Sequence, residues 1–324
     1  MQFRYYRNAQ NGSQGGALAV SYHWQRRIDR MKNAARGLFG GRENNQPRPK
    51  LCPACGSLVG INATRCHECG ANLTFSLAAV SKKLSGLMGD NEAPATTLLL
   101  IANILMFGVT WIVSMARGQQ GLSVLFGFNG EALYRLGMGI PFRYDDFNWY
   151  RMLTAMYLHG GLIHIGFNMM ALMNIGPAVE QVYGSARYFF CYTVCGFCGS
   201  LMSATFSSAP SVGASGAILG LIGLLLAITT RRGGAYMNAL RGRLISSVVS
   251  IFAIGLFFSG LRTDNWAHFG GLAAGFALGR ILTDREPMNV RERNIAYSLG
   301  WSAFAAVLAG FILMIMHFSK PIAG

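Results

Sequence analysis

The feature that most constrains this chain is a series of seven apolar segments, each long enough to cross a lipid bilayer as a helix. A crossing helix needs roughly 20 apolar residues, because the hydrocarbon core is about 30 Å thick and every backbone polar group must be paired inside it. The composition agrees, since 52% of the 324 residues are hydrophobic and 13% are charged. The segments are expected near residues 96–116, 161–181, 186–206, 215–231, 244–261, 265–282 and 294–317. An all-α protein with several membrane spans is therefore predicted.

The distribution of charge predicts the orientation of these spans. The net charge is +15, and 13 of the 28 Lys and Arg residues lie in residues 1–95. Lys and Arg favour cytoplasmic loops, so we expect the N-terminus in the cytoplasm and the C-terminus outside. The remaining inner-side arginines are Arg187, Arg231, Arg232, Arg241, Arg243, Arg280, Arg285, Arg291 and Arg293, whereas the outer side has Arg262 and Lys320, apart from the long 117–160 connection.

The basic charge is interpreted as facing lipid. It is not accompanied by an aromatic and basic recognition pattern, so no nucleic-acid partner is expected. Residues 1–7 are not followed by an apolar core, so we expect no signal peptide. Together with a cytosolic head, this favours the inner membrane of a bacterium.

Two Cys-x-x-Cys-Gly repeats predict a metal site near the N-terminus. They contain Cys52 with Cys55 and Cys66 with Cys69. Four thiolates at this spacing are typical of a structural zinc ribbon, and they leave no open coordination position for a catalytic water. A pair of disulfides is the alternative, and a cytosolic location disfavours it. We expect folding of this module to depend on Zn²⁺, and its cytosolic partner is unknown.

Five regions follow from these patterns. They are a disordered or basic amphipathic cytosolic segment (1–50), the zinc-ribbon module (51–71), a linker (72–95), a six-helix catalytic core (96–282) and a loop with a seventh transmembrane helix (283–324). Within the core, the 117–160 connection is too polar to span and too apolar to be free in water. It is expected to form an interfacial subdomain beside the helices.

Four polar side chains are expected at one depth of the membrane. Ser215 and His268 each begin an apolar segment, and His164 and Asn168 lie four residues apart on one helical face. Polar groups at this depth are costly unless they are used. Ser215 can act as nucleophile and His268 as its base, while His164, Asn168 and the backbone N–H of Ser215 can stabilise an oxyanion.

A Ser-His-Asp triad is not expected, because the carboxylates lie at the ends of the spans. Glu180 is at the inner end of its segment, and Asp264 is at the rim, one turn before His268. The glycines around positions 271 and 275 would let two helices approach closely enough for Ser215 and His268 to touch.

This pattern resembles the rhomboid family of intramembrane serine proteases. The resemblance covers residues 96–282, and it is carried by three motifs: Gly213-Ala214-Ser215-Gly216, Ala267-His268-x-x-Gly271-x-x-x-Gly275, and His159-x-x-x-x-His164-x-x-x-Asn168. Trp149-Tyr150-Arg151 is similar to the Trp-Arg element of the family, and Glu180 to its inner-face carboxylate, which is expected to pair with an arginine.

The resemblance implies a six-helix bundle with a Ser-His dyad that cleaves single-span membrane proteins and needs no cofactor for catalysis. The zinc ribbon lies outside the resemblance, and the last apolar segment resembles the extra C-terminal helix of some members. Supporting roles are implied for Arg151, His159, Glu180, Gly213, Gly271 and Gly275. The sequence departs from the family at Leu219, where many members have an aromatic ring that stacks on the base.

Other interpretations of the same residues stay open. The chain can be a non-catalytic relative that binds and escorts membrane segments, or a transporter that uses the polar cluster as an ion site. A transporter would be expected to show paired repeats and broken helices, which the sequence does not suggest. Each polar side chain alone could also serve helix packing, for example a serine that bonds to its own helix.

Overall fold

The computed structural model describes residues 50–52, 57–60, 63–70, 72–73, 93–119, 121, 123–143, 148–257 and 263–319. The amphipathic segment expected before residue 50, the cysteine at position 55 and most of the 72–95 linker lie outside these residues. Residues 1–49 and 50–324 are separate units, and all the elements below belong to the second.

Seven long helices occupy the seven apolar segments. They are α3 (Pro94–Ala116), α7 (Leu162–Tyr183), α8 (Ser185–Phe206), α9 (Ser215–Arg231), α10 (Ala235–Phe257), α11 (Asn265–Ile281) and α12 (Val290–His317). The expected start of the fifth segment at 244 is wrong, because α10 already begins at Ala235. Hydropathy placed the start too late because Arg241 and Arg243 are polar, although both continue the helix.

Five of these helices are long and apolar enough to cross a membrane, namely α3, α7, α8, α10 and α12. The other two, α9 and α11, have 17 residues each. At a rise of 1.5 Å per residue such a helix is about 26 Å long, which is shorter than a hydrocarbon core of about 30 Å. The two helices that carry Ser215 and His268 are thus the shortest of the seven.

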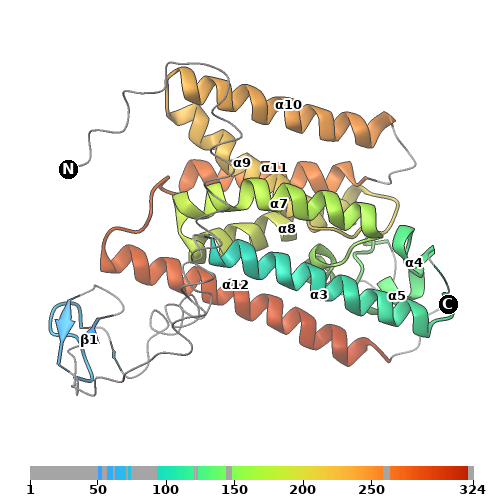
Figure 1. Ribbon diagram of the computed structural model, residues 1–324, viewed down its shortest axis with the longest axis horizontal. Coiled ribbons are helices and arrows are strands. Elements are labelled where there is room, and N and C mark those ends of the chain that lie inside the picture. Colours follow the sequence, from blue (N-terminus) through green and yellow to red (C-terminus); the bar gives the residue numbers. More distant parts are fainter. Residues whose placement is uncertain are drawn as a thin grey trace, which may run out of the picture. The chain divides into compact units, whose positions relative to one another are not determined.

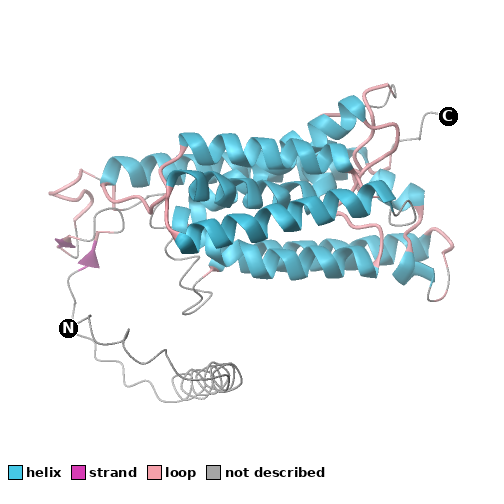
Figure 2. Ribbon diagram, turned by 90° about the horizontal axis from the view of Figure 1, so that it is seen from above, coloured by secondary structure: helices cyan, strands magenta, loops and turns pink. Residues whose placement is uncertain are grey.

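Helix α9 lies at the centre of the bundle. It packs most extensively on α11 and also contacts α7, α8 and α10. Most of its side chains are buried, including Leu221 and Leu224, which are fully enclosed. Figure 1 shows α10 along one edge of the bundle and α12 along the opposite edge, with α7, α8, α9 and α11 between them. Figure 2 shows the same long helices side by side.

Helix α10 is the least buried of the candidate spans. In its most apolar 18-residue stretch only 6% is buried, compared with 44% in the corresponding stretch of α8. Leu244 is its one buried residue among those that the structure describes. Side chains such as Ile245, Val249 and Leu256 are exposed, as expected for a helix that meets lipid on much of its circumference, whereas Leu240, Val248 and Ile251 pack partly buried against the bundle.

The described residues of the 117–160 connection include four short helical elements. They are α4 (Ser123–Phe126), α5 (Gly130–Arg135), α6 (Arg151–Thr154) and the 3₁₀ helix η1 (Ala155–Tyr157). The buried guanidinium of Arg151 holds this connection together: Nη1 donates to the carbonyls of Tyr134 at 2.8 Å and Met138 at 3.1 Å. The same guanidinium lies 4.2 Å from the centre of the Tyr134 ring, within the range of a cation–π contact.

The cysteine-containing module has a small antiparallel ribbon. Strands β1 (Lys50–Leu51) and β2 (Leu58–Val59) pair with Lys50 opposite Val59. The amide of Cys52 donates to the carbonyl of Ser57 at 2.8 Å. An isolated bridge pairs Arg65 with Asn72. Cys52 from the first of these segments lies close to Cys66 and Cys69 from the second.

Candidate active site

Ser215 and His268 lie in direct contact. The distance between Ser215 Oγ and His268 Nε2 is 2.9 Å, which is hydrogen-bond distance. Ser215 is the first residue of α9, and its side chain is half-buried; His268 lies in the first turn of α11 and is buried. Because the hydroxyl meets an imidazole nitrogen, it has a base positioned to take its proton.

Glycines on facing helices make this contact possible. A Cβ on Gly271 would collide with the carbonyl oxygen of Gly216, and a Cβ on Gly275 would collide with that of Gly220. The backbones of α9 and α11 therefore touch over two turns. Since Gly216 follows Ser215 directly, this approach determines how close the hydroxyl comes to the imidazole.

The start of α11 is capped by Asp264. Its Oδ1 accepts a hydrogen bond from the amide of Ala267 at 3.0 Å, and its Oδ2 accepts one from Ser203 of α8. A carboxylate at this position satisfies a helix N–H that has no intrahelical partner. Asp264 thus holds the helix of His268, while Nδ1 of His268 has no hydrogen-bond partner among the described residues.

An aromatic side chain that nothing in the sequence singles out lies beside His268. The rings of Phe252 in α10 and His268 are 6.0 Å apart between centroids, with an angle of 81° between their planes. This is an edge-to-face arrangement. Leu219, by contrast, is buried and packs in a cluster with Ile222 and Leu244.

His164 faces Ser215 from α7. A Cβ on Gly213 would lie 2.8 Å from His164 Nε2 and 3.8 Å from Ser215 Oγ, so both atoms border the same small space. Gly213 has φ +130°, a conformation that favours glycine. The amide of Gly160 donates to His164 Nδ1 at 3.3 Å, so the neutral ring carries its proton on Nε2, toward that space.

Asn168 and His159 accompany His164. The side-chain amide of Asn168 is buried and donates to the backbone carbonyl of His164 at 2.9 Å. His159 is fully buried, and its ring meets that of His164 edge-on with 5.2 Å between centroids. Four of the predicted polar side chains therefore gather at the same end of the bundle, whereas Asn168 is engaged with its own helix.

The expectation that Glu180 pairs with an arginine was wrong among the residues that the structure describes, where its partners are the start of α3 and Ser185. Oε1 accepts from the amide of Ala95 at 2.8 Å and from Ser185 Oγ at 2.6 Å. Oε2 accepts from the amide of Thr96 at 2.8 Å and from its hydroxyl at 2.7 Å. A buried carboxylate with four donors satisfies the unpaired N–H groups of a helix start.

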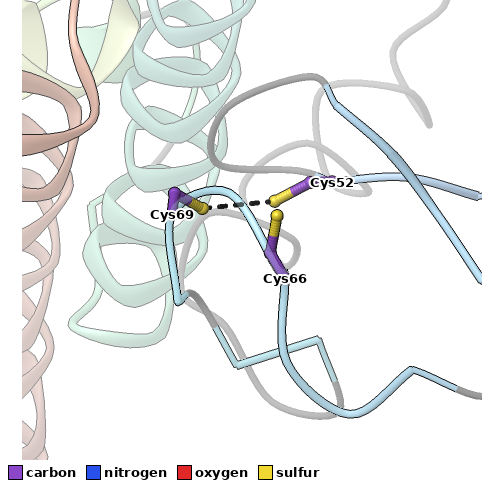
Figure 3. Close-up of side chains that lie close together, drawn as sticks. All are labelled: Cys52, Cys66 and Cys69. Atoms are coloured by element: carbon purple, nitrogen blue, oxygen red, sulfur yellow. Dashed lines mark hydrogen bonds between the residues drawn. The ribbon is translucent and has the colours of Figure 1, made fainter.

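Three of the four predicted metal ligands come together in the ribbon. The sulfur atoms of Cys52, Cys66 and Cys69 all lie within 4.8 Å of one another. Figure 3 shows the three side chains pointing toward one another. The distance between the sulfurs of Cys52 and Cys69 is 3.7 Å, too long for a disulfide. It agrees with the separation of about 3.8 Å between two thiolates on one tetrahedral zinc ion. The residues present therefore fit the expected metal, and Cys55 lies outside the described residues.

Sequence reasoning missed the residues that depend on helix rotation. Nothing local marks Phe252 as a neighbour of His268, because the side of α10 that faces the base is set by packing. Thr96 and Ser185 were missed for the same reason. A signal did exist for Gly216 and Gly220, since their spacing of four matches that of Gly271 and Gly275.

Comparison with known proteins places the chain in one family. Residues 146–285 match the Rhomboid domain. The chain is 32% identical over 252 residues to RHOMBOID-like protein 5 of Arabidopsis thaliana, and the match covers 66% of this chain and 81% of that protein. It is 34% identical over 196 residues to Rhomboid protease GluP of Bacillus subtilis, covering 60% of this chain and 36% of the relative.

A third relative is RHOMBOID-like protein 6, mitochondrial, of Arabidopsis thaliana, at 43% identity over 135 residues. That match covers 41% of this chain and 43% of the relative. The chain thus spans less than half the length of two of these relatives and most of the length of the other. With its apolar helices and this degree of similarity, the chain belongs to the rhomboid family, as an all-α protein that crosses the membrane several times.

Proposed function

We propose that this chain is an intramembrane serine endopeptidase in which Ser215 is the nucleophile and His268 is the general base. The observation that carries the proposal is the 2.9 Å distance between Ser215 Oγ and His268 Nε2. The similarity to a protein named Rhomboid protease GluP supports the same chemistry. The lack of a protein partner for His268 Nδ1 among the described residues supports a dyad over a triad.

The reaction follows from this contact. His268 Nε2 takes the proton of Ser215 as Oγ attacks the carbonyl carbon of the scissile peptide bond. The resulting tetrahedral intermediate expels the amine, which receives the same proton from His268. A water molecule then gives its proton to His268 and attacks the acyl ester, and the collapse of the second intermediate returns the proton to Ser215. No cofactor takes part in these steps.

The oxyanion would be stabilised beside Ser215. The backbone N–H of Ser215 has no intrahelical partner, because Ser215 is the first residue of α9. His164 directs Nε2–H to the same space. Asn168 can contribute its side-chain amide if it exchanges its bond to the carbonyl of His164 for one to the substrate. Loss of one such donor typically costs about 3–4 kcal/mol of transition-state stabilisation.

The substrates we propose are single-span membrane proteins. To cleave a peptide bond inside a transmembrane helix, the enzyme must hold both the dyad and water at the depth of that bond in the membrane. Helices α9 and α11 are each about 26 Å long and begin at the dyad, so their ends can lie below the lipid headgroups. Helix α10 packs loosely on the bundle, since only 6% of its most apolar stretch is buried. A substrate helix could therefore approach the dyad from this side.

The orientation we propose has the N-terminus in the cytoplasm and the C-terminus outside. Arg231, Arg232, Arg280 and Arg285 lie at the helix ends opposite to Ser215 and His268, as the positive-inside rule requires of a cytoplasmic side. A bacterial inner membrane stays a prediction, since the relatives named above come from both a bacterium and a plant.

For the ribbon we propose a structural Zn²⁺ site formed by Cys52, Cys55, Cys66 and Cys69, in a module that docks an unknown cytosolic partner. The mutual proximity of three of these sulfurs supports it. When bound, the ion would hold the segment of Cys52 and Cys55 against the segment of Cys66 and Cys69. It has no part in peptide cleavage.

The decisive test of catalysis uses the purified full chain in liposomes with a model single-span substrate. We expect cleavage by the wild-type protein and none by Ser215→Ala. The matched control is Ser302→Ala, an exposed serine in α12 that should leave cleavage unchanged. Cleavage that survives Ser215→Ala would exclude the dyad. A wild-type protein that binds the substrate without cutting it would instead favour the non-catalytic escort function.

A further inference from the structure

The base of the proposed dyad is held by few contacts. Among the described residues His268 makes one side-chain hydrogen bond, between Nε2 and Ser215 Oγ at 2.9 Å, while Nδ1 has no partner there. In a catalytic triad, a third polar group on the other ring nitrogen fixes the orientation of the imidazole. Here the orientation of the ring must depend on packing against its neighbours.

Position 219 supplies no aromatic ring for that packing. Leu219 is buried in a cluster with Ile222 and Leu244, against the partly buried side chains of Val248 and Ile251. Val248 and Ile251 belong to α10, so Leu219 is part of the surface on which α10 packs. An aromatic ring at this position is the family feature that the sequence lacks.

Phe252 occupies the face of the base instead. Its ring lies edge-to-face with that of His268, at 6.0 Å between centroids and 81° between planes. Phe252 follows Val248 by four residues, so the two share one face of α10. The face that rests on Leu219 therefore also directs Phe252 to the imidazole.

A second contact ties this part of α10 to the helix of the base. The side-chain amide of Asn265, the first residue of α11, lies 3.5 Å from the carbonyl of Phe252. A Cβ on Gly255 would collide with the side chains of Asn265 and Thr263, so the two helices approach closely here. The position of the Phe252 ring thus depends on how α10 sits against the start of α11.

We propose that Phe252 is a positioning residue for His268, and that it takes over from α10 the role that a ring at position 219 has in many rhomboids. This inference rests on the proposed dyad and adds a residue to it. Helix α10 is only lightly buried, and it carries the ring that contacts His268. The orientation of the imidazole therefore depends on how α10 packs against the bundle. Without the Phe252 ring, His268 would lose its aromatic neighbour and with it a restraint on the orientation of its ring.

The test compares Phe252→Ala with Phe252→Tyr and with Phe257→Ala in the purified full chain. Phe257 lies on the same helix, is 80% exposed and provides the matched control. We expect Phe252→Ala to lower kcat about five- to tenfold with little change in KM, because the loss concerns the base rather than substrate binding. Phe252→Tyr should restore kcat, and Phe257→Ala should leave it unchanged.

A compensating substitution makes the test sharper. If the two positions serve one purpose, Leu219→Tyr in the Phe252→Ala background should recover at least part of the lost kcat, and the two changes should be non-additive. Wild-type kcat in Phe252→Ala would overturn the proposal. A lower melting temperature of Phe252→Ala without a separate effect on kcat would also overturn it, if neither Phe252→Tyr nor Leu219→Tyr recovers activity.

A spectroscopic measurement separates this inference from the proposed function. In the inactive Ser215→Ala protein, the carbon-bound ring protons of His268 should change chemical shift when Phe252 is replaced by Ala, and not when Phe257 is. Unchanged His268 signals would refute the contact whether or not the protein cleaves. A protein that fails to cleave but shows the expected shifts would refute the protease function alone.

Discussion

The carboxylate of Glu180 accepts two hydrogen bonds from Thr96, one from its amide at 2.8 Å and one from its hydroxyl at 2.7 Å. The two residues lie on α7 and at the start of α3, which are separated by the whole 117–160 connection. This carboxylate therefore joins the first helix of the bundle to the helix that carries His164.

Replacement of Glu180 by Gln should destabilise the protein. Both carboxylate oxygens face donors, so the new NH₂ group would meet N–H or O–H groups and leave them unpaired. We expect a loss of about 1.5–3 kcal/mol in the free energy of unfolding. Thermal unfolding in detergent would measure it, with the exposed Glu286→Gln as control. Equal stability of the two variants would contradict the role of Glu180 as a helix-joining residue.

Gly271→Ala should separate the helices of the dyad. The added Cβ would collide with the carbonyl of Gly216, which a shift of α9 or α11 must relieve. Overpacking of this kind costs about 1–3 kcal/mol. We expect a lower melting temperature and a marked loss of cleavage, because Ser215 moves with Gly216. Gly108→Ala in α3 is the control, since a Cβ there would have nothing within 4 Å; similar behaviour of both variants would argue against the close approach.

The ribbon should contain zinc that depends on its cysteines. Elemental analysis of the full chain is expected to give about one zinc ion per molecule, bound by four thiolates. Cys66→Ser should lower this content strongly, because a serine hydroxyl is a poor zinc ligand. Cys198→Ser in α8, away from the cluster, should retain it. A wild-type protein free of zinc, or zinc that persists in Cys66→Ser, would exclude the proposed site.

The stability of the protein should fall in mild acid because of His159. Burial, together with repulsion from His164, lowers the pKa of His159 from 6.5 to about 3. The unfolded chain then binds a proton that the folded protein does not bind between these values. The contribution of this residue is thus complete above pH 6.5 and is lost as the pH falls toward 3.

The measurement compares wild type with His159→Asn by chemical denaturation at several pH values. From pH 6.5 to pH 5, wild type should lose about 2 kcal/mol more than the variant, since one proton corresponds to about 1.4 kcal/mol per pH unit. Between pH 7 and 8 the two proteins should show the same slope. Parallel curves over the whole range would mean that His159 takes up its proton in the folded state.

Much of this protein follows from local sequence. A hydrocarbon solvent permits few backbone structures, so long apolar segments identify the helices directly. The positions of Ser215 and His268 at the starts of two such segments suggested that they meet, and their spacing of glycines suggested how. The resemblance to the rhomboid family rested on these same residues, and the comparisons confirmed the family.

Other features depend on contacts that no local pattern records. The start of α10 was misplaced because arginines at a helix end lower the hydropathy without breaking the helix. The predicted partner of Glu180 was wrong because a buried carboxylate can be satisfied either by an arginine or by the N–H groups of a helix start. The packing of α3 on α7 decides between these two partners.

The sequence alone determined which segments are helical and apolar, because these properties are sums over neighbouring residues. Which face of each helix meets which neighbour is set by the packed bundle, and this packing brings Phe252 of α10 against His268. The physical reason is that the rotation and depth of a helix are set by side chains from several segments packing at once, with a precision of a few ångströms that hydropathy does not contain.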